Sequence, residues 1–497
     1  MLEKVDQSRD RVGHTRVQWI WALIANSTLF IYGLETGWMS PMTKVLQSDP
    51  SPIGAALSDN EIYLVASILF MTATLSVPFY TYISDCYGRR PAIMCVTVFE
   101  GLSWIIKVSS PTRIGLIVAR AIAGIGASGC FLVIPMYVKE ISQDNIRGLL
   151  GSLIIMAQNV GVLLMYTIGT FLDYFTVLWI ALSMSILVVI LMLKAPESPA
   201  FLVKRSKFEE AVKTIAHLRG VEVDSAIVQK EIDVMRKQEL YYQSVPRISL
   251  LSIIQNKNWL RIVILILLMI TVHATNGAVS VITYGASTLT ASGIQYSISP
   301  DIQSLSFPVM MIIGSLVLMA TVERFGRKPL MGVCLMLSVC SMAALGVALL
   351  LQSSGISPPN WLPVLAMVGI VFGYATGVSP LPFIIMSEIL NFQIRAKVMG
   401  LVVTYSWFMN FMQLIIYGQI SMYLGYHSTF FFFAGLNLFG FFVSLFLLPE
   451  TKGKSDEDIE TCDSHFYPKR GRYSNPLYAN ASPGLIITHR TLLVLKP

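Results

Sequence analysis

The chain has 497 residues, of which 54% are hydrophobic and 13% are charged. Soluble domains carry about 25% charged residues, and soluble chains of this length divide into domains that each need a polar surface. The composition excludes a disordered chain, a collagen and a disulfide-rich secreted scaffold, and it favours a protein whose solvent is the lipid bilayer. The net charge of +7 does not indicate nucleic acid binding, because the basic residues gather between apolar segments.

Twelve apolar segments follow one another along the chain. Each is about as long as, or longer than, the roughly 20 residues that a membrane-spanning helix needs. They are predicted at residues 19–39, 61–83, 91–108, 114–136, 149–171, 175–194, 259–290, 302–321, 330–351, 361–386, 397–423 and 428–448. The first is longer than the apolar part of a signal peptide and is followed by eleven others, so we interpret it as a span. The sequence therefore predicts an all-α membrane protein with 12 transmembrane helices.

Lys and Arg are concentrated in alternate connections, which predicts orientation because basic loops stay in the cytoplasm. The opposite connections carry few basic residues, among them Lys44 and, near one turn, Lys107 and Arg113. The predicted parts are a cytoplasmic N-terminus (1–18), an N-terminal six-helix half (19–194), a cytoplasmic helical linker (195–257), a C-terminal six-helix half (258–448) and a cytoplasmic tail (449–497). We expect a multi-pass protein, both of whose termini are cytoplasmic, in the plasma membrane.

The linker contains two predicted helices, at residues 208–220 and 231–243. Gly220 is the expected C-terminal cap of the first helix. The second is expected to end before Pro246.

The two halves repeat three short patterns in the same order. An acid, a glycine and two basic residues follow the second and the eighth span, at residues 85–90 and 323–328. A glutamate followed seven residues later by an arginine comes after the fourth and the tenth span. Pro-Glu closes the sixth and the twelfth span, at residues 196–197 and 449–450. Three patterns in one order indicate an internal duplication.

These patterns, with Arg120 before AIAGIGASG and with the segments PMYVKE (135–140), PESPAFL (196–202), PLP (380–382) and PETKGK (449–454), carry a family resemblance. Over roughly residues 19–454 the chain resembles the sugar porter family of the major facilitator superfamily, in particular animal facilitative hexose carriers and insect facilitated trehalose transporters. The resemblance implies two six-helix halves of the major facilitator fold and a transporter for a sugar or similar polyhydroxy solute that works by alternating access, without a cofactor. The glycines of AIAGIGASG are predicted to let neighbouring helices approach closely.

The repeated charges are predicted to lie where helices end at the cytoplasmic edge, where carboxylates and guanidinium groups can pair bidentately. The resemblance implies that they close an inner gate. The set is Asp85, Arg89, Arg90, Glu140, Arg147, Glu197, Glu323, Arg327, Lys328, Glu388, Arg395 and Glu450. The alternative interpretation is that these charges only set the topology.

A sugar is recognised by neutral hydrogen-bonding side chains and an aromatic face, and sites in such folds lie near the midplane between the halves. The candidates are Gln158, Asn159, His273, Asn276, Tyr284, Phe383, Trp407 and Asn410. Gly277 is expected to loosen the seventh span, and Pro380 and Pro382 are expected to break the tenth and form a hinge. The family's usual QQLSGIN reads HATNGAV at residues 273–279, so the substrate is left open between a sugar and a polyol. Each polar candidate can instead be an interhelical contact.

Glu35 stands in the first span, where an acid is a functional candidate. It is either the proton site of a proton-coupled solute symporter or an acid in a wet outer vestibule. We expect the second, because its own span contains no Arg or His partner beside it. Arg120 is expected to face protein.

The function expected first is a facilitative carrier, and the alternatives are the symporter and a transport-inactive nutrient sensor. The expected partners are the solute and membrane lipid, with no nucleic acid, metal or enzymatic activity.

Overall fold

A computed structural model describes residues 14–244, 249–390 and 392–450. Most of the predicted N-terminal segment, residues 245–248, residue 391 and the predicted tail from residue 451 onward lie outside the described residues. In the described part the chain is helical, without strands, and the predicted all-α fold is confirmed.

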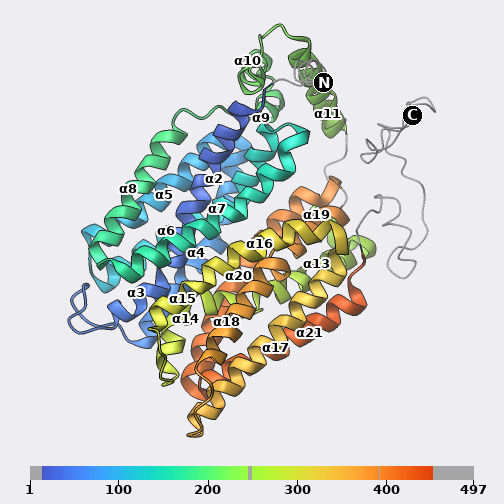
Figure 1. Cartoon of the computed structure of the whole chain (residues 1–497). Helices are drawn as coiled ribbons and strands as arrows, with labels where there is room; N and C mark the ends of the chain where they lie inside the picture. The colour runs from blue at the N-terminus through green and yellow to red at the C-terminus, as the bar shows by residue number, and fades with distance from the viewer. Residues whose placement is uncertain (1–13, 245–248, 391, 451–497) are drawn as a thin grey trace, which may run out of the picture. The chain divides into compact units, whose positions relative to one another are not determined.

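The amino-terminal half comprises seven helices. They are α2 (Arg16–Gly37), α3 (Met39–Leu46), α4 (Asp59–Cys86), α5 (Arg89–Ser109), α6 (Arg113–Ile141), α7 (Asp144–Phe171) and α8 (Tyr174–Met192). The linker contains α9 (Pro199–Lys204), α10 (Phe208–Arg219), α11 (Ala226–Ser244) and α12 (Leu250–Gln255). Figure 1 shows α9, α10 and α11 together at one end of the amino-terminal helices.

The carboxy-terminal half has more interruptions. Its elements are α13 (Lys257–Ala274), α14 (Ala278–Ala291), α15 (Pro300–Ser304), α16 (Ser306–Phe325), α17 (Arg327–Ser353), α18 (Trp361–Gly373), the π-helix η1 (Tyr374–Val378), α19 (Leu381–Ile389), α20 (Phe392–Leu424) and α21 (Tyr426–Leu447). Two predicted spans are therefore broken near their middle, α13 with α14 and α18 with η1 and α19.

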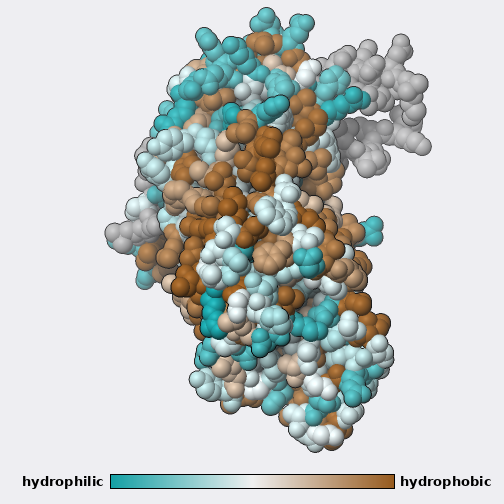
Figure 2. All heavy atoms as spheres, turned by 90° about the vertical axis from the view of Figure 1, so that its left-hand side faces the viewer, coloured by the Kyte–Doolittle hydropathy of each residue, from teal (hydrophilic) through white to brown (hydrophobic). Residues whose placement is uncertain are grey.

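Within the described residues, 12 helical stretches are long and apolar enough to cross a membrane, as predicted. Large apolar side chains, such as Leu75, Ile114 and Phe446, are exposed on them. Such surface is unfavourable in water and is expected where helices face lipid. Figure 2 shows hydrophobic side chains gathered over the middle of one face and hydrophilic ones toward its ends.

The linker is attached to the amino-terminal half by backbone and side-chain hydrogen bonds. Arg219 donates from Nη1 to the carbonyl oxygen of Ile141 over 2.9 Å, and Gln18 donates to the carbonyl oxygen of Leu218 over 3.2 Å. The predicted cap of α10 is confirmed, since Gly220 adopts φ 62° in the left-handed region, which glycine enters without steric cost. The second linker helix, in contrast, begins at Ala226, earlier than predicted.

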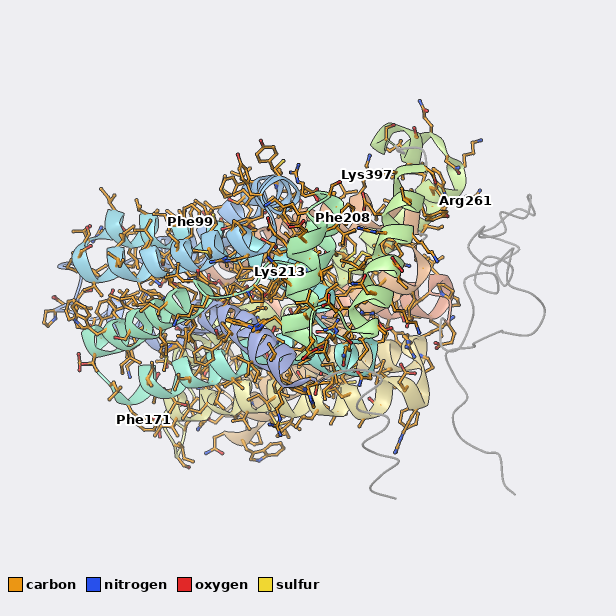
Figure 3. The ribbon with its side chains drawn as sticks, turned by 90° about the horizontal axis from the view of Figure 1, so that it is seen from above. Phe99, Phe171, Phe208, Lys213, Arg261 and Lys397 are labelled. Carbon is orange, nitrogen blue, oxygen red and sulfur yellow. The ribbon has the colours of Figure 1, made fainter. Side chains whose placement is uncertain are left out.

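We call the end of the helices that meets α9–α11 the linker end, and the end that holds α3 and α15 the far end. Figure 3 shows Arg261 and Lys397 toward one end of the helices and Phe171 toward the other. Lys213 belongs to linker helix α10, and Phe171 is the last residue of α7. The basic residues therefore gather at the linker end, in keeping with the predicted pattern.

The halves share one buried core only in part of their length. One cluster joins amino-terminal residues such as Leu29 to Ile282, Phe307 and Tyr417 of the carboxy-terminal half. Two further clusters, around Met331 and around Val398, contain residues of the carboxy-terminal half and the neighbouring α12. The halves are thus packed together along one part of the helices and have separate cores along another.

Small residues permit the close packing inside the amino-terminal half. A Cβ at Gly124 would overlap the Leu69 carbonyl oxygen, and one at Gly129 would overlap Val96. The packing function predicted for the glycines of AIAGIGASG is confirmed. Gly33 and Gly161 make a reciprocal approach of α2 and α7 that the sequence analysis did not identify.

Candidate functional site

At the linker end of the amino-terminal half, Arg89 and Glu140 form a bidentate ion pair. Arg89 Nη2 lies 2.9 Å from one Glu140 oxygen and Nε lies 2.9 Å from the other. Arg89 Nη1 also donates to the carbonyl oxygen of Ser84 over 3.0 Å. Because Arg89 begins α5 and Glu140 lies in the last turn of α6, the pair ties two helix ends together.

Glu197, which follows α8, caps the same helix start. Its carboxylate accepts hydrogen bonds from the backbone N–H groups of Arg89 at 2.9 Å and Arg90 at 3.3 Å. The first N–H groups of a helix lack partners within the helix and favour an anion there. Burial raises the pKa of Glu197, and the hydrogen bonds from Ser198, Arg90 and Arg89 oppose that shift.

The carboxy-terminal half repeats this arrangement. Arg327 Nη2 lies 2.8 Å from Glu388, and Glu450 accepts hydrogen bonds from the backbone N–H groups of Arg327 and Lys328, each at 3.1 Å. Arg327 Nη1 also donates to the carbonyl oxygen of Val322, as Arg89 does to that of Ser84. The internal duplication predicted from the sequence is therefore visible in side-chain contacts.

The first acids of the two repeated loops differ in their partners. Asp85 pairs with Lys204 of α9 at 3.1 Å, whereas Glu323 pairs with Arg327 on its own helix at 2.9 Å. Arg90 donates to the carbonyl oxygen of Leu193.

Arg147 and Arg395, expected in the same network, bond helix-end carbonyl groups. Arg147 donates to Ser142 O over 3.1 Å and pairs with Asp144. Arg395 donates to Leu390 O over 2.8 Å. The ion pairs described in these clusters join residues of one half or, for Asp85 and Lys204, one half and the linker, so closure of an inner gate across the halves stays a prediction.

Replacing Arg89 by Ala should destabilise the protein by about 2 kcal/mol, because a hydrogen-bonded and largely buried carboxylate at Glu140 loses its cation. Thermal unfolding of the purified protein measures this. The matched control is Lys204→Ala, which removes the exposed pair with Asp85 and should cost less than about 1 kcal/mol. Equal losses in the two variants would contradict the importance given to the Arg89 cluster.

The seventh span is interrupted at Thr275–Gly277, between α13 and α14. Gly277 adopts φ 93°, so the predicted loosening of this span is confirmed. Asn437 of α21 donates to the freed carbonyl oxygen of Asn276 over 2.8 Å, and the Asn276 amide bonds the Asn437 side chain in return. Gln413 of α20 reaches the Ser280 hydroxyl over 3.3 Å. A buried carbonyl group freed from its helix needs a partner such as the one that Asn437 gives to Asn276.

The tenth span is also interrupted, as predicted near Pro380 and Pro382. A π-helical stretch, Tyr374–Val378, precedes Pro380. His273 stacks on Tyr374, with ring centroids 5.7 Å apart, and meets Phe383 edge-on at 5.5 Å. Within the described residues, His273 Nδ1 is buried without a hydrogen-bond partner. The two interruptions therefore meet at this aromatic stack, while hinge motion at the prolines stays a prediction.

Trp407 of α20 projects into the amino-terminal half. Its ring lies 5.8 Å from Phe70, 5.9 Å from Phe131 and 6.0 Å from Tyr32, between ring centroids. Asn410 lies one turn further along α20, donates to the carbonyl oxygen of Ser406 over 2.8 Å, and keeps its buried Oδ1 without a partner among the described residues. Trp407 and Asn410 thus combine an aromatic face with a free acceptor near the boundary of the halves.

The remaining candidates have other contacts. Asn159 donates to Ser315 Oγ over 3.0 Å, across the two halves. Tyr284 stacks on Tyr417 at 5.0 Å, and its hydroxyl has no partner in the described part of the chain. Asn159 and Asn276 thus make the interhelical contacts of the alternative interpretation. Gln158 is partly buried on α7 beside Asn159.

Three polar contacts join the halves near the far end. Lys44 of α3 pairs with Asp301 of α15 at 3.4 Å. The Tyr63 hydroxyl lies 3.1 Å from the Ser421 hydroxyl. Tyr166 donates to the carbonyl oxygen of Ile282. Together with the shared core, these contacts hold the halves together on this side.

Glu35 is 1% exposed, so its interpretation as an acid in a wet vestibule is wrong. Its carboxylate lies 2.7 Å from Lys107 Nζ and 3.1 Å from Arg120 Nη1, and it accepts a hydrogen bond from Ser103 over 2.8 Å. Lys107, assigned from the sequence to a connection near a turn, is buried in the last turn of α5. The expectation that Arg120 faces protein is confirmed. The partners were missed because they come from two other helices.

The family model described as "Sugar (and other) transporter" matches residues 21–462. The chain belongs to this sugar transporter family. Its 12 apolar helices and its membership of this family make it a multi-pass integral membrane protein.

Curated relatives of this chain include facilitated trehalose transporters named Tret1. The protein from Bombyx mori is 26% identical over 432 residues, which are 86% of this chain and 83% of that protein. The protein from Drosophila virilis is 28% identical over 386 residues, which are 77% of this chain. The chain spans only 41% of the length of the Drosophila virilis relative.

Solved structures of the xylose transporter XylE have the same fold as this chain. The proton:xylose symporter XylE bound to 6-bromo-6-deoxy-D-glucose matches with a TM-score of 0.70 and 20% identity, covering 90% of this chain and 100% of that one. The inward open conformation of XylE from E. coli matches with a TM-score of 0.72 and 18% identity, covering 89% of this chain and 98% of that one. At these identities the likeness concerns the fold alone.

Proposed function

We propose that this sugar transporter family member carries a sugar or similar polyhydroxy solute across the membrane by alternating access, down the gradient of the solute. The observation that carries the proposal is the uneven contact between the halves. Lys44–Asp301, Tyr63–Ser421 and the shared core join them toward the far end, whereas Arg89–Glu140 and Arg327–Glu388, the ion pairs described at the linker end, each join helices of one half. Two halves that close on one side at a time are what alternating access requires.

The proposed orientation places the linker end in the cytoplasm, because the basic residues gather there. The far end then faces outside, and the arrangement described corresponds to the state closed to the outside. In the opposite state, the clusters around Arg89 and Arg327 would approach each other and form the inner gate. A two-state equilibrium of this kind responds to a solute that binds the two states unequally. The proposed location is the plasma membrane.

The proposed solute site combines aromatic faces with unsatisfied polar atoms. His273, Trp407 and Asn410 carry the argument. The rings of His273 and Trp407 lie among other aromatic rings, and His273 and Asn410 each keep a buried polar atom without a partner in the described residues. Sites for small polar molecules typically have such a composition. The names of the Tret1 relatives favour trehalose as the first sugar to test.

Uptake into proteoliposomes tests the proposal, with labelled trehalose, glucose and a polyol as solutes. We expect at least one to equilibrate to equal concentrations inside and outside. Asn410→Ala should lower its uptake at low concentration about tenfold, as the loss of about 1.4 kcal/mol of binding predicts. Ser183→Ala is the matched control, because Ser183 is exposed and its hydroxyl donates to the carbonyl oxygen of Trp179 on its own helix. Failure of every solute to enter would contradict the proposal.

A second candidate function, proton-coupled solute symport, is favoured by one observation. Glu35 is a buried carboxylate paired with Arg120, and buried acids within the membrane commonly serve proton relays. The same vesicles discriminate the two functions, because an inward proton gradient drives a symporter above equal concentrations and leaves a uniporter unaffected.

A further inference from the structure

The Lys107 ammonium occupies a site built for a cation. Its Nζ lies 2.8 Å and 2.7 Å from the two carboxylate oxygens of Glu35. The same atom lies 3.6 Å from the centre of the Trp104 ring and 4.8 Å from the centre of the Trp38 ring. The Lys107 side chain is fully buried. Aromatic faces stabilise a desolvated cation, so the carboxylate and both rings hold the charge of Lys107 in place.

The surroundings of Glu35 contain one more cation and one more acid. Arg120 on α6 pairs with the carboxylate and also donates to the carbonyl oxygen of Glu35 over 2.8 Å. Glu100 lies on α5, one turn before Ser103, and accepts a hydrogen bond from Cys130 Sγ over 3.2 Å. Glu35 therefore faces two cations directly, while Glu100 bonds a thiol.

The other helices packed against α2 add no charge at this depth. The charged residues of α7 are Asp144 and Arg147 in its first turns, at the linker end, and α8 contains none. Lys44 of α3 is exposed and pairs with Asp301. Buried phenols on these helices are Tyr32 of α2, Tyr284 of α14 and Tyr166 of α7, which donates to the carbonyl oxygen of Ile282.

A carboxylate paired with one arginine is neutralised only while that pair is intact. When the pair breaks, a proton can take the place of the arginine. At Glu35 a second positive group is already seated on both oxygens. Since α2, α5 and α6 belong to the same half, rocking of the halves leaves this group in place. We propose that the Lys107 ammonium permanently occupies the position of a coupling proton at Glu35 and thereby makes transport independent of a proton gradient. This inference deepens the proposed facilitative function and rests on it.

The test compares Lys107→Met and Lys107→Gln with the parent in vesicles buffered inside at about pH 7.5 and outside at about pH 5.5 or 7.5. The parent and the charge-conserving control Lys107→Arg should take up the solute equally at both external values. Lys107→Met should accumulate it above equal concentrations when the outside is acidic, and a protonophore should abolish the accumulation. The double variant Lys107→Met/Glu35→Gln should again take up the solute equally at both external pH values. Gradient-driven accumulation by the parent would overturn the inference. So would Lys107→Met and Lys107→Gln variants that transport the solute but do not accumulate it when the outside is acidic.

A second measurement separates this inference from the transport proposal. A carboxyl group that gains a proton in the fold adds stability that is lost as the pH rises. Between about pH 5.5 and pH 7.5, the Tm of purified Lys107→Met should therefore fall more than that of the parent, and Glu35→Gln in the same background should remove the difference. If the parent carries no solute, the transport proposal fails and this comparison still decides the proton site. Lys107→Gln, whose amide can bond one Glu35 oxygen, replaces Lys107→Met if the latter does not fold. Equal pH responses with and without Glu35 would overturn the inference.

Discussion

Glu35→Gln should destabilise the protein by about 3–5 kcal/mol, the cost of removing one partner from a buried ion pair. The substitution leaves Lys107 and Arg120, both almost fully buried, without their shared carboxylate. Thermal unfolding and the fraction of monodisperse protein in detergent measure the loss. Adding Lys107→Met to this variant should recover part of the stability, because one of the two uncompensated charges is then removed.

Glu210→Gln is the matched control for this substitution. Glu210 also pairs with a lysine, Lys207, at 3.0 Å, but both side chains are more than half exposed. Exposed pairs contribute little because water already solvates and screens their charges. If Glu35→Gln and Glu210→Gln unfolded at the same temperature as the parent, the prediction that the buried cluster stabilises the protein would be wrong.

Cross-linking the halves at their far end should abolish transport, and cleavage of the cross-link should restore it. Lys44 and Asp301 come from different halves, and the Lys44 side chain is 69% exposed, so an added reagent can reach it. Both residues are replaced by cysteine and joined with a short bifunctional methanethiosulfonate reagent. Dithiothreitol then reverses the link. A carrier that cannot open on this side cannot complete its cycle, so uptake into intact cells should fall to background.

The control for this experiment is an ion pair of similar exposure inside one half. Arg113 and Glu61 lie 2.9 Å apart, and both belong to the amino-terminal half. The same two cysteine replacements and the same reagent should leave uptake close to that of the untreated variant. Full activity after complete cross-linking of residues 44 and 301 would contradict alternating access as proposed.

Hydropathy and local backbone preference determined the helical fold of this protein. The apolar segments predicted all 12 spans because a helix that faces lipid must be apolar along its whole length. Gly220 and Gly277 could be identified from the sequence as a helix cap and a loosened position, because glycine adopts positive φ without steric cost. In the structure they have φ of 62° and 93°. The duplicated charges could also be identified from the sequence, since each half repeats its motifs at the same helix ends.

The partners of the buried polar groups were decided only by the tertiary structure. Lys107 and Arg120 stand 72 and 85 residues from Glu35, and Asn437 stands 161 residues from Asn276. Every face of a membrane helix is largely apolar, so its pattern does not tell which face meets lipid and which meets another helix. The sequence could therefore name Glu35 as a candidate from its rarity in a span. Only the packing of α2 against α5 and α6 reveals a carboxylate paired with two cations, one of which, Lys107, lies against two indole rings.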